Sequence, residues 1–451
     1  MVERSEERLG TAPLGRLMFS LALPSLTAQL VNLLYNIVDR IYIGHIPGEG
    51  ALALTGLGIC NPVLLIISAF SMFVGMGGSP LAAIALGKGD RERAERILGS
   101  GTTLLLFFSA LLTAFFYFGR EPILYAFGAS DATYPYADAY LSVYLIGTVF
   151  VQASLGLNPF ISCQGAARTA MLSVLLGAIC NIILDPIFIF ALDMGVKGAA
   201  TATVISQGVS ALWVLSFLCS GRSVIRLRLS RMKPDWAILR RSTALGISPF
   251  IMSSTECLII IVYNTQLLRY GGDLHVGSMT VLLSIFSLFS CIVQGVAAGV
   301  QPIMSYNYGA GNYQRVTTCF RRALVICMGI TAAGTLISVS CPDMLTSLYT
   351  DDVELIALCS QALPIYQASL WIFGAQMVVQ QFFMALGQAG RSFFIAVLRK
   401  IILLIPLLFI FPRFWGVTGI YIAEPVSDFL SATTSLLVAW PLYKQLKNRS
   451  V

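Results

Sequence analysis

Twelve apolar segments follow one another along the chain, each near the ~20 residues that an α-helix needs to cross a bilayer. Only 11% of the residues are charged, against roughly 25% in a soluble domain. The pattern predicts an all-α polytopic membrane protein with 12 transmembrane helices, embedded in membrane lipid. The approximate spans are 15–43, 51–86, 94–118, 135–159, 167–191, 197–220, 238–269, 277–308, 319–341, 358–386, 392–411 and 416–441.

Basic residues gather in alternate loops. With the N-terminus in the cytoplasm, 24 of the 29 Lys and Arg fall on the inner side, with Arg399 and Lys400 counted as an inner flank. An excess of Lys and Arg marks cytoplasmic loops. We therefore predict a multi-pass protein of the cytoplasmic membrane with both termini in the cytoplasm. The net charge of +7 then follows from topology, and we expect no nucleic-acid partner.

A sequence repeat divides the chain into halves. GSPLAAIALGKGDRER from Gly78 matches VQPIMSYNYGAGNYQR from Val300, and GVKGAA from Gly195 matches GVTGIY from Gly416. Two halves with an even number of helices insert in the same orientation and place a site between them. We predict two pseudo-symmetric six-helix bundles. The boundaries are an N-lobe at 1–220, a cytoplasmic linker at 221–236 and a C-lobe at 237–451.

Asp39 lies inside the first apolar segment, where an ionisable group is costly unless it has a partner, an ion or water. Asn181 and Asp185 stand at i and i+4 in the fifth segment, and Thr203 lies in the sixth. At 1.5 Å rise per residue, Asp39, Asp185 and Thr203 lie ~8–10 Å inside the outer boundary. We expect these groups to meet.

Two carboxylates, an amide oxygen and a hydroxyl suit a hard monovalent cation, and adjacent carboxylates favour protonation. Asp39, Asn181, Asp185 and Thr203 are therefore candidates for cation coupling, and for metal binding if the ion is Na⁺. The alternative is a buried polar network that only locks helices together. Apart from a coupling Na⁺ or H⁺, we expect no cofactor.

Candidate substrate contacts lie deeper in the membrane. Tyr35 and Asn36 share the helix face of Asp39, towards the interior. Glu256 is ~20 Å deep, and Tyr263 shares its face, so a lone anion beside an aromatic ring would suit a lipophilic cation. Alternatively, Glu256 carries a proton without touching substrate.

A polar stripe on the last segment has two possible roles, since it can line water or a second proton site, or face the bundle interior. The stripe comprises Thr418, Tyr421, Glu424, Asp428, Ser431 and Ser435.

Enzymatic chemistry has no support in the sequence. No nucleophile–base pair, HExxH or Walker A motif is convincing, and the only two histidines are His45 and His275. We expect a protein that is not an enzyme. Without an ATPase domain, uphill transport would draw on an ion gradient.

Several motifs together resemble the multidrug and toxic compound extrusion (MATE) family over nearly the whole chain. They are LPSLTAQL at Leu23, VDRIYIG at Val38, the loops GKGDRERA and GAGNYQRV, QGAAR at Gln164, NIILDP at Asn181 and GVKGAATAT at Gly195. The resemblance implies a V-shaped cleft between lobes, and antiport of Na⁺ or H⁺ against an organic cation or other drug.

The resemblance also assigns residues. It implies that Asp39, Asn181, Asp185 and Thr203 form the N-lobe cation site and that Glu256 is the acid of the seventh helix. Some members carry an acid in the tenth helix, whereas this chain reads WIFGAQMVVQQ there. A complete C-lobe cation site is therefore not expected.

The favoured hypothesis is a monomeric, cation-coupled antiporter that exports small molecules: organic cations, drugs or other xenobiotics, by alternating access. One alternative is a lipid-linked oligosaccharide flippase, which needs a cation-lined cleft for pyrophosphate. The expectation that helix interiors lack Lys and Arg, Arg40 apart, counts against it. Another is a non-transporting membrane receptor or scaffold, whose embedded acids could be neutralised without a phenotype.

Overall fold

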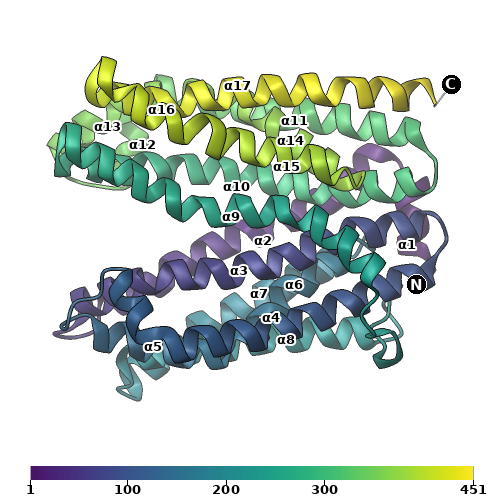
Figure 1. Cartoon of the computed structure of the whole chain (residues 1–451), viewed down its shortest axis with the longest axis horizontal. Coiled ribbons are helices and arrows are strands. Elements are labelled where there is room, and N and C mark those ends of the chain that lie inside the picture. Colours follow the sequence, from purple (N-terminus) through teal and green to yellow (C-terminus); the bar gives the residue numbers. More distant parts are fainter. Residues whose placement is uncertain (1, 450–451) are drawn as a thin grey trace.

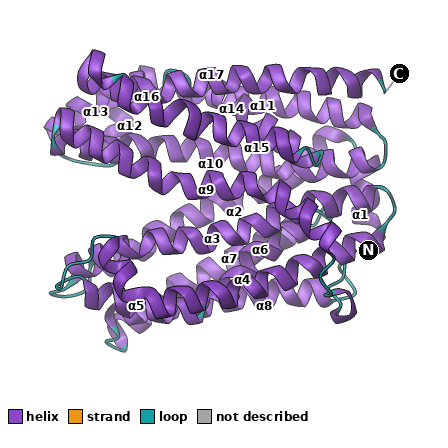
Figure 2. Ribbon diagram, viewed as in Figure 1, coloured by secondary structure: helices purple, strands orange, loops and turns teal. Residues whose placement is uncertain are grey.

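The computed structural model describes residues 2–449. It describes their side chains as well, except those of residues 2–6 and 257. The described part is helical and forms two stacked bundles, one from each half of the chain (Figures 1 and 2). The first half contains α1 (Val2–Thr11), α2 (Leu14–Gly44), α3 (Gly50–Gly87), α4 (Arg91–Ala126), α5 (Tyr134–Ile146), α6 (Thr148–Ser162), α7 (Ala167–Pro186), η1 (Ile187–Ala191) and α8 (Gly195–Cys219). A short η2 (Leu229–Arg231) follows in the linker.

The second half contains α9 (Trp236–Gly271), α10 (Asp273–Gly309), α11 (Tyr313–Ser340), α12 (Pro342–Ser347), α13 (Val353–Tyr366), α14 (Leu370–Ala385), α15 (Ala389–Val397), η3 (Leu398–Leu404), α16 (Ile405–Ile410) and α17 (Pro412–Asn448). Nine described helical stretches are long and apolar enough to span a membrane, and two bent pairs raise the number to 11. The 37-residue α17 supplies the twelfth predicted span.

Two spans are bent rather than continuous. The fourth breaks by 60° between α5 and α6 at Gly147, and the tenth breaks by 55° between α13 and α14. Glycine weakens a helix because it lacks a side chain and keeps more freedom when unfolded.

The N-terminal α1 is also absent from the predicted spans. It is held at α10 and α11, where Asn307 and Arg315 both donate to the carbonyl of Leu9.

The sequence repeat corresponds to a repeat in the structure. Asp90 caps α4 by accepting from the backbone N–H of Arg93, and Asn312 caps α11 by accepting from that of Arg315. A methyl group added at Gly87 would lie 2.0 Å from the carbonyl oxygen of Tyr306, and one at Gly309 would lie 2.1 Å from that of Ile84. These reciprocal contacts relate α3 to α10 by an approximate twofold rotation.

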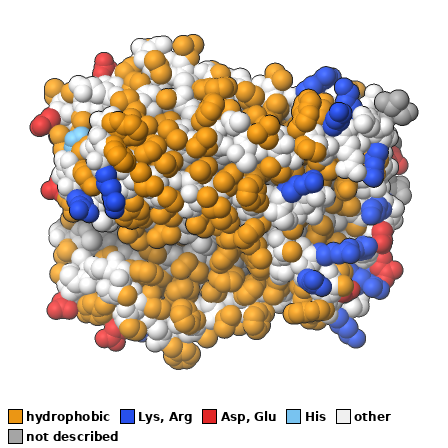
Figure 3. All heavy atoms as spheres, turned by 45° about the horizontal axis from the view of Figure 1, so that its top comes forward, with side chains coloured by type: hydrophobic (Ala, Val, Ile, Leu, Met, Phe, Trp, Pro, Cys, Tyr) orange, Lys and Arg blue, Asp and Glu red, His pale blue; other side chains and the backbone are white. Residues whose placement is uncertain are grey.

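The two lobes meet closely at one end of the molecule. A methyl group at Gly77 would lie 2.3 Å from the oxygen of Ser242, and one at Gly299 would lie 2.5 Å from the Cα of Ala22. At the opposite end the bundles diverge, which gives the V shape in Figure 1. Lys and Arg side chains gather at the joined end, beyond a broad apolar surface (Figure 3).

The connection between the lobes is fastened to the N-lobe. The side-chain oxygen of Gln164 accepts hydrogen bonds from Val224 N at 2.7 Å, Ile225 N at 3.2 Å and Ser223 Oγ at 3.0 Å. Buried Glu95 also pairs with Arg231 at 3.3 Å. The linker therefore packs as a part of the folded structure.

Candidate cation and substrate sites

The four candidate cation ligands meet in the N-lobe, where α2, α7 and α8 pack together. The Asn181 amide donates to Asp185 Oδ1 at 3.1 Å and to Thr203 Oγ1 at 3.4 Å. The Asp39 carboxyl group comes from α2, which packs against α7, and lies near that of Asp185. All four side chains are buried. These residues meet, as their common depth in the membrane predicted; their role in cation coupling stays a prediction.

Several oxygens of this cluster have no protein partner. Asp39 Oδ1, Asn181 Oδ1 and Asp185 Oδ2 are buried without a hydrogen bond to any described residue. In the described part of the chain, no Lys or Arg donates to either carboxylate, and Arg40 is exposed. Buried acids without neutralisation are unfavourable, so this arrangement fits a bound monovalent cation or proton. No cluster of three His, Cys, Asp or Glu occurs among the described residues.

Aromatic residues that sequence reasoning missed border the acids. Tyr140 and Tyr144 of α5 are buried and stack with 6.1 Å between ring centroids. Tyr140 lies beside Tyr35, Asp39 and Thr203. The spacing of four residues between the tyrosines in YADAYLSVY was the available signal, because such residues share a helix face.

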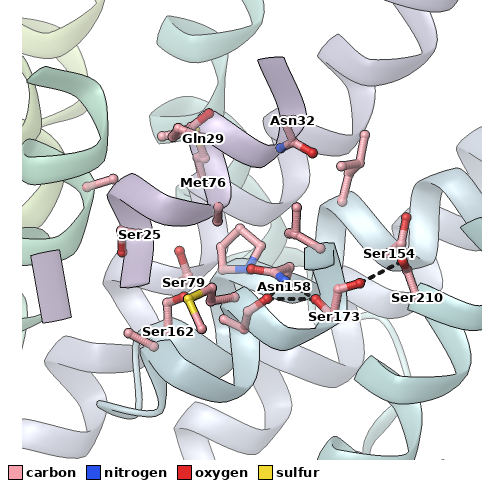
Figure 4. A pocket seen from close by; sticks show the side chains of 18 of the residues that line it. Ser25, Gln29, Asn32, Met76, Ser79, Ser154, Asn158, Ser162, Ser173 and Ser210 are labelled. Atoms are coloured by element: carbon pink, nitrogen blue, oxygen red, sulfur yellow. Dashed lines mark hydrogen bonds between the residues drawn. The ribbon is translucent and has the colours of Figure 1, made fainter. Parts of the chain in front are cut away.

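A large cavity lies next to this cluster, between α2, α3, α6, α7, α8 and the inner part of α10 (Figure 4). It encloses about 1320 Å³ free of protein atoms, part of it open to solvent. Its polar lining is Ser25, Gln29, Asn32, Tyr35, Ser79, Ser154, Asn158, Ser162, Ser173, Ser206, Gln207, Ser210, Gln301 and Ser305. No described residue that lines it is charged.

The cavity wall combines fixed polar groups with soft apolar ones. Asn158 Nδ2 donates to Ser173 Oγ at 2.6 Å, while Gln301 Nε2 and Ser305 Oγ have no partner within the described part of the chain. Met76 lines the wall with Met72 and Met171, and methionine adapts to ligands of different shape. The cavity can therefore bind organic molecules of varied shape through packing and neutral hydrogen bonds.

The predicted substrate contacts separate in the structure. Tyr35 lines the cavity, whereas Asn36 is exposed and donates to the carbonyl of Asn32 at 2.7 Å. The description of Glu256 as a lone anion is wrong, because its carboxylate pairs with Lys400 Nζ at 3.2 Å and its side chain is 51% exposed. Tyr263 is buried elsewhere and donates to Glu424 at 2.7 Å. Neither Glu256 nor Tyr263 lines this cavity.

Arg399 and Lys400 require a correction. They lie in η3, inside the eleventh span, and are only 5% and 6% exposed, so the expectation of an inner flank and of helix interiors without basic residues is wrong. Without them the inner count falls from 24 to 22 of the 29, and the bias remains. An ion pair can hold a guanidinium within a span, which a count of charges along the sequence does not reveal.

Arg399 is the centre of a second buried cluster. Its Nε lies 2.6 Å from Asp428 Oδ1 and its Nη2 lies 3.1 Å from Glu424 Oε1. The guanidinium carbon is 4.7 Å from the ring centroid of Phe373. Tyr421, Glu424, Asp428, Ser431 and Ser435 are all buried. Thr418, the first residue of the predicted stripe on α17, is exposed. The other five residues face the bundle interior, which is one of the two roles considered for the stripe.

Comparison with known proteins agrees with this architecture. The MatE family model matches residues 24–187 and 249–410. Multidrug export protein MepA of Staphylococcus aureus strain N315 is 26% identical over 440 residues, covering 96% of this chain and 95% of that protein. MepA of Staphylococcus saprophyticus is 24% identical over 429 residues, covering 95% and 94%.

A crystal structure of MATE in the bent conformation has the same fold, with a TM-score of 0.92 at 24% identity and 99% of both chains covered. The family model spans most of the chain, in two matches that fall one in each half. The chain therefore belongs to the MatE family and is a multi-pass membrane transporter.

Proposed function

We propose that this protein is a cation-coupled antiporter that exports drug-like organic molecules across the cytoplasmic membrane. The observation that carries the proposal is the pair Asp39–Asp185, whose free oxygens are buried one helical turn from Tyr35 in the cavity wall. Na⁺ or H⁺ binds at the acids, and the substrate binds in the cavity. The transporter acts as a monomer with both termini in the cytoplasm.

The helix α2 connects the two sites. Asp39 contributes to the cation cluster, while Tyr35, Asn32 and Gln29 line the cavity on the same helix. Pro24 lies 15 residues before Asp39, in the closely packed region of the lobes, and a proline interrupts the hydrogen bonds of a helix. Loss or gain of the cation changes how α2 packs against α7, and bending near Pro24 reshapes the cavity. Each ligand thus biases a shared conformational equilibrium.

Lipophilic cations are the proposed substrates, and the named MepA relatives are multidrug exporters. The cavity supports such ligands through Tyr35 and its methionines, because an aromatic face attracts a cation. The acids beyond Tyr35 add a negative field. Competition between substrate and coupling ion for this field gives exchange rather than co-transport.

The two alternatives have weaker support. A flippase for pyrophosphate-linked lipids needs Lys or Arg in its cavity, and none of the described lining residues is basic. The buried Arg399 and Lys400 lie in the other lobe and are already paired with acids. A receptor or scaffold leaves the unpaired oxygens at Asp39 and Asp185 without a use.

The test is ethidium efflux from proteoliposomes containing the purified full-length chain, with Na⁺ and pH gradients imposed separately. We expect at least one gradient to drive efflux, and the gradient that does so identifies the ion. Efflux that responds to neither gradient would overturn the cation-coupled antiporter proposal, and absence of any efflux would favour the receptor or scaffold.

A further inference from the structure

Each lobe contains a buried polar cluster built from corresponding spans. In the N-lobe, α2, α7 and α8 supply Asp39, Asp185 and Thr203, and they are the first, fifth and sixth spans. In the C-lobe, the corresponding α9, η3 and α17 supply Tyr263 and the triad of Arg399, Glu424 and Asp428.

The sixth spans can be aligned by their glycines. Gly195 and Gly416 have positive φ angles of 52° and 56°. Three residues later, a methyl group at Gly198 would lie 2.6 Å from the carbonyl oxygen of Phe188, and one at Gly419 would lie 2.5 Å from that of Phe411. Counting eight residues on from Gly195 and from Gly416 places Thr203 opposite Glu424.

The fifth spans align in the same way. Gly165 and Gly387 precede them, with φ angles of 83° and 68°. Counting twelve residues from each glycine places Gly177 opposite Arg399. Gly177 borders the open N-lobe cavity. The C-lobe therefore carries a guanidinium at the position where the N-lobe has a glycine, which packs against Ser210 of α8 at the edge of the cavity.

The two clusters differ in whether a basic side chain contacts their acids. In the N-lobe, three carboxyl and amide oxygens lack partners among the residues that the structure describes. In the C-lobe, Arg399 bridges Asp428 at 2.6 Å and Glu424 at 3.1 Å, and Tyr263 donates to the second oxygen of Glu424 at 2.7 Å. Ser427 donates to the carbonyl of Arg399 at 2.8 Å and fastens the backbone beside it.

We propose that Arg399 is a tethered cation that fills the C-lobe counterpart of the N-lobe cation site. A guanidinium keeps its charge in proteins and cannot diffuse away. Both acids of the C-lobe thus keep a cationic partner throughout the transport cycle, and only the N-lobe exchanges an ion. This inference rests on the proposed cation coupling and extends it to one exchangeable cation site per transporter.

Neighbouring charges do not alter this assignment. Lys400 pairs with Glu256 of α9 at 3.2 Å. Tyr366 of α13 also lies close to Glu424 and Asp428 and brings a neutral hydroxyl group. Phe373 offers its ring face to the guanidinium at 4.7 Å. These contacts fix Arg399 between the two acids.

The test measures cation-dependent thermal unfolding of the purified full-length protein in detergent. Na⁺ is titrated against choline at constant ionic strength, and the pH is varied in a second series. Wild type is compared with three variants. The first is Asp39→Asn/Asp185→Asn, and the second adds Arg399→Gln to it. The third adds Glu424→Gln and Asp428→Asn to the second.

We expect the wild type to be stabilised by one of the cations and the Asp39→Asn/Asp185→Asn variant to have a flat response. Addition of Arg399→Gln exposes two acids without a counter-ion, so a cation response returns, and the two further neutral substitutions remove it again. Two results would overturn the proposal. One is a cation response in Asp39→Asn/Asp185→Asn that Glu424→Gln/Asp428→Asn removes. The other is a folded Asp39→Asn/Asp185→Asn/Arg399→Gln variant that shows no cation response.

If Arg399→Gln prevents folding, a second variant tests the proposal. Arg399→Gln/Glu424→Gln/Asp428→Asn on the wild-type background removes the whole triad of charges together. An apparent cation affinity within twofold of wild type supports the tethered cation, and a larger loss contradicts it. Equal responses of wild type and Asp39→Asn/Asp185→Asn would instead refute the proposed N-lobe coupling site.

Discussion

Gly309→Ala is expected to open the contact between the lobes at the end predicted to be cytoplasmic. The added methyl carbon would lie 2.1 Å from the carbonyl oxygen of Ile84. Carbon and oxygen atoms in close contact normally stay about 3.3 Å or more apart. The two helices must therefore separate by about 1 Å where α3 and α10 cross.

The size of the effect follows from this overlap. Inserting a methyl group into a packed contact costs about 1–3 kcal/mol. Because the contact joins the lobes, separation of the lobes relieves the strain, and the cost applies to the closed arrangement alone. A bias of about 1–3 kcal/mol changes a conformational equilibrium roughly 5- to 150-fold.

Cys163 provides the readout, since it lines the cavity and is buried. With the other cysteines replaced, a membrane-impermeant maleimide is applied to inside-out vesicles. Labelling of Cys163 in Gly309→Ala is expected to be about 5- to 150-fold faster than in the parent, in proportion to the population shift.

Gly329→Ala is the matched control. It lies in α11, and a methyl group there would have no atom within 4 Å, so labelling is expected to stay at the parent rate. If folded Gly309→Ala also labels at the parent rate, close packing at Gly309 does not hold the lobes together at this end.

Three further predictions concern the cavity, the linker and the topology. Tyr35→Ala should raise the KM for ethidium about 5- to 30-fold, because about 1–2 kcal/mol of cation–π attraction is lost. Asn36 is exposed, so Asn36→Ala should leave the KM unchanged. Equal KM values for wild type and Tyr35→Ala in transport assays would exclude Tyr35 from the substrate site. Gln164→Ala should lower the thermal unfolding midpoint, because the buried N–H groups of Val224 and Ile225 lose their acceptor, which costs about 1–3 kcal/mol of stability. Gln314 is exposed, so Gln314→Ala should leave the midpoint unchanged. Equal midpoints for Gln164→Ala and wild type would show that the linker is not anchored at Gln164. Reporters fused to the two termini should both be protected from outside protease in whole cells, and cleavage of either would contradict the charge-based orientation.

The N-lobe cluster could be predicted because it depends on regular geometry. Asp185 and Asn181 share a face at i and i+4, and helical rise gives the depth of Asp39 and Thr203 without knowledge of the packing. The two repeated lobes were visible for a similar reason, since glycines such as Gly87 and Gly309 are needed where backbones approach closely.

The C-lobe cluster could not be predicted, because it depends on which helix faces meet. Arg399 is 25 residues from Glu424, and no local spacing shows that their side chains point at one another. Lys400, the next residue, contacts Glu256 on a different helix. The wall of the cavity escaped prediction for the same reason, because its neutral serines and methionines stand out only after five helices of one lobe and α10 are assembled.

The most direct test of cation coupling at Asp39 is uphill transport by Asp39→Asn. Wild type and variant are reconstituted at equal density, checked for equal thermal stability, and given the same driving gradient with equal ethidium on both sides. We predict that wild type builds an ethidium gradient and that Asp39→Asn, which retains its fold, builds none. An ethidium gradient of wild-type size in Asp39→Asn would contradict the account.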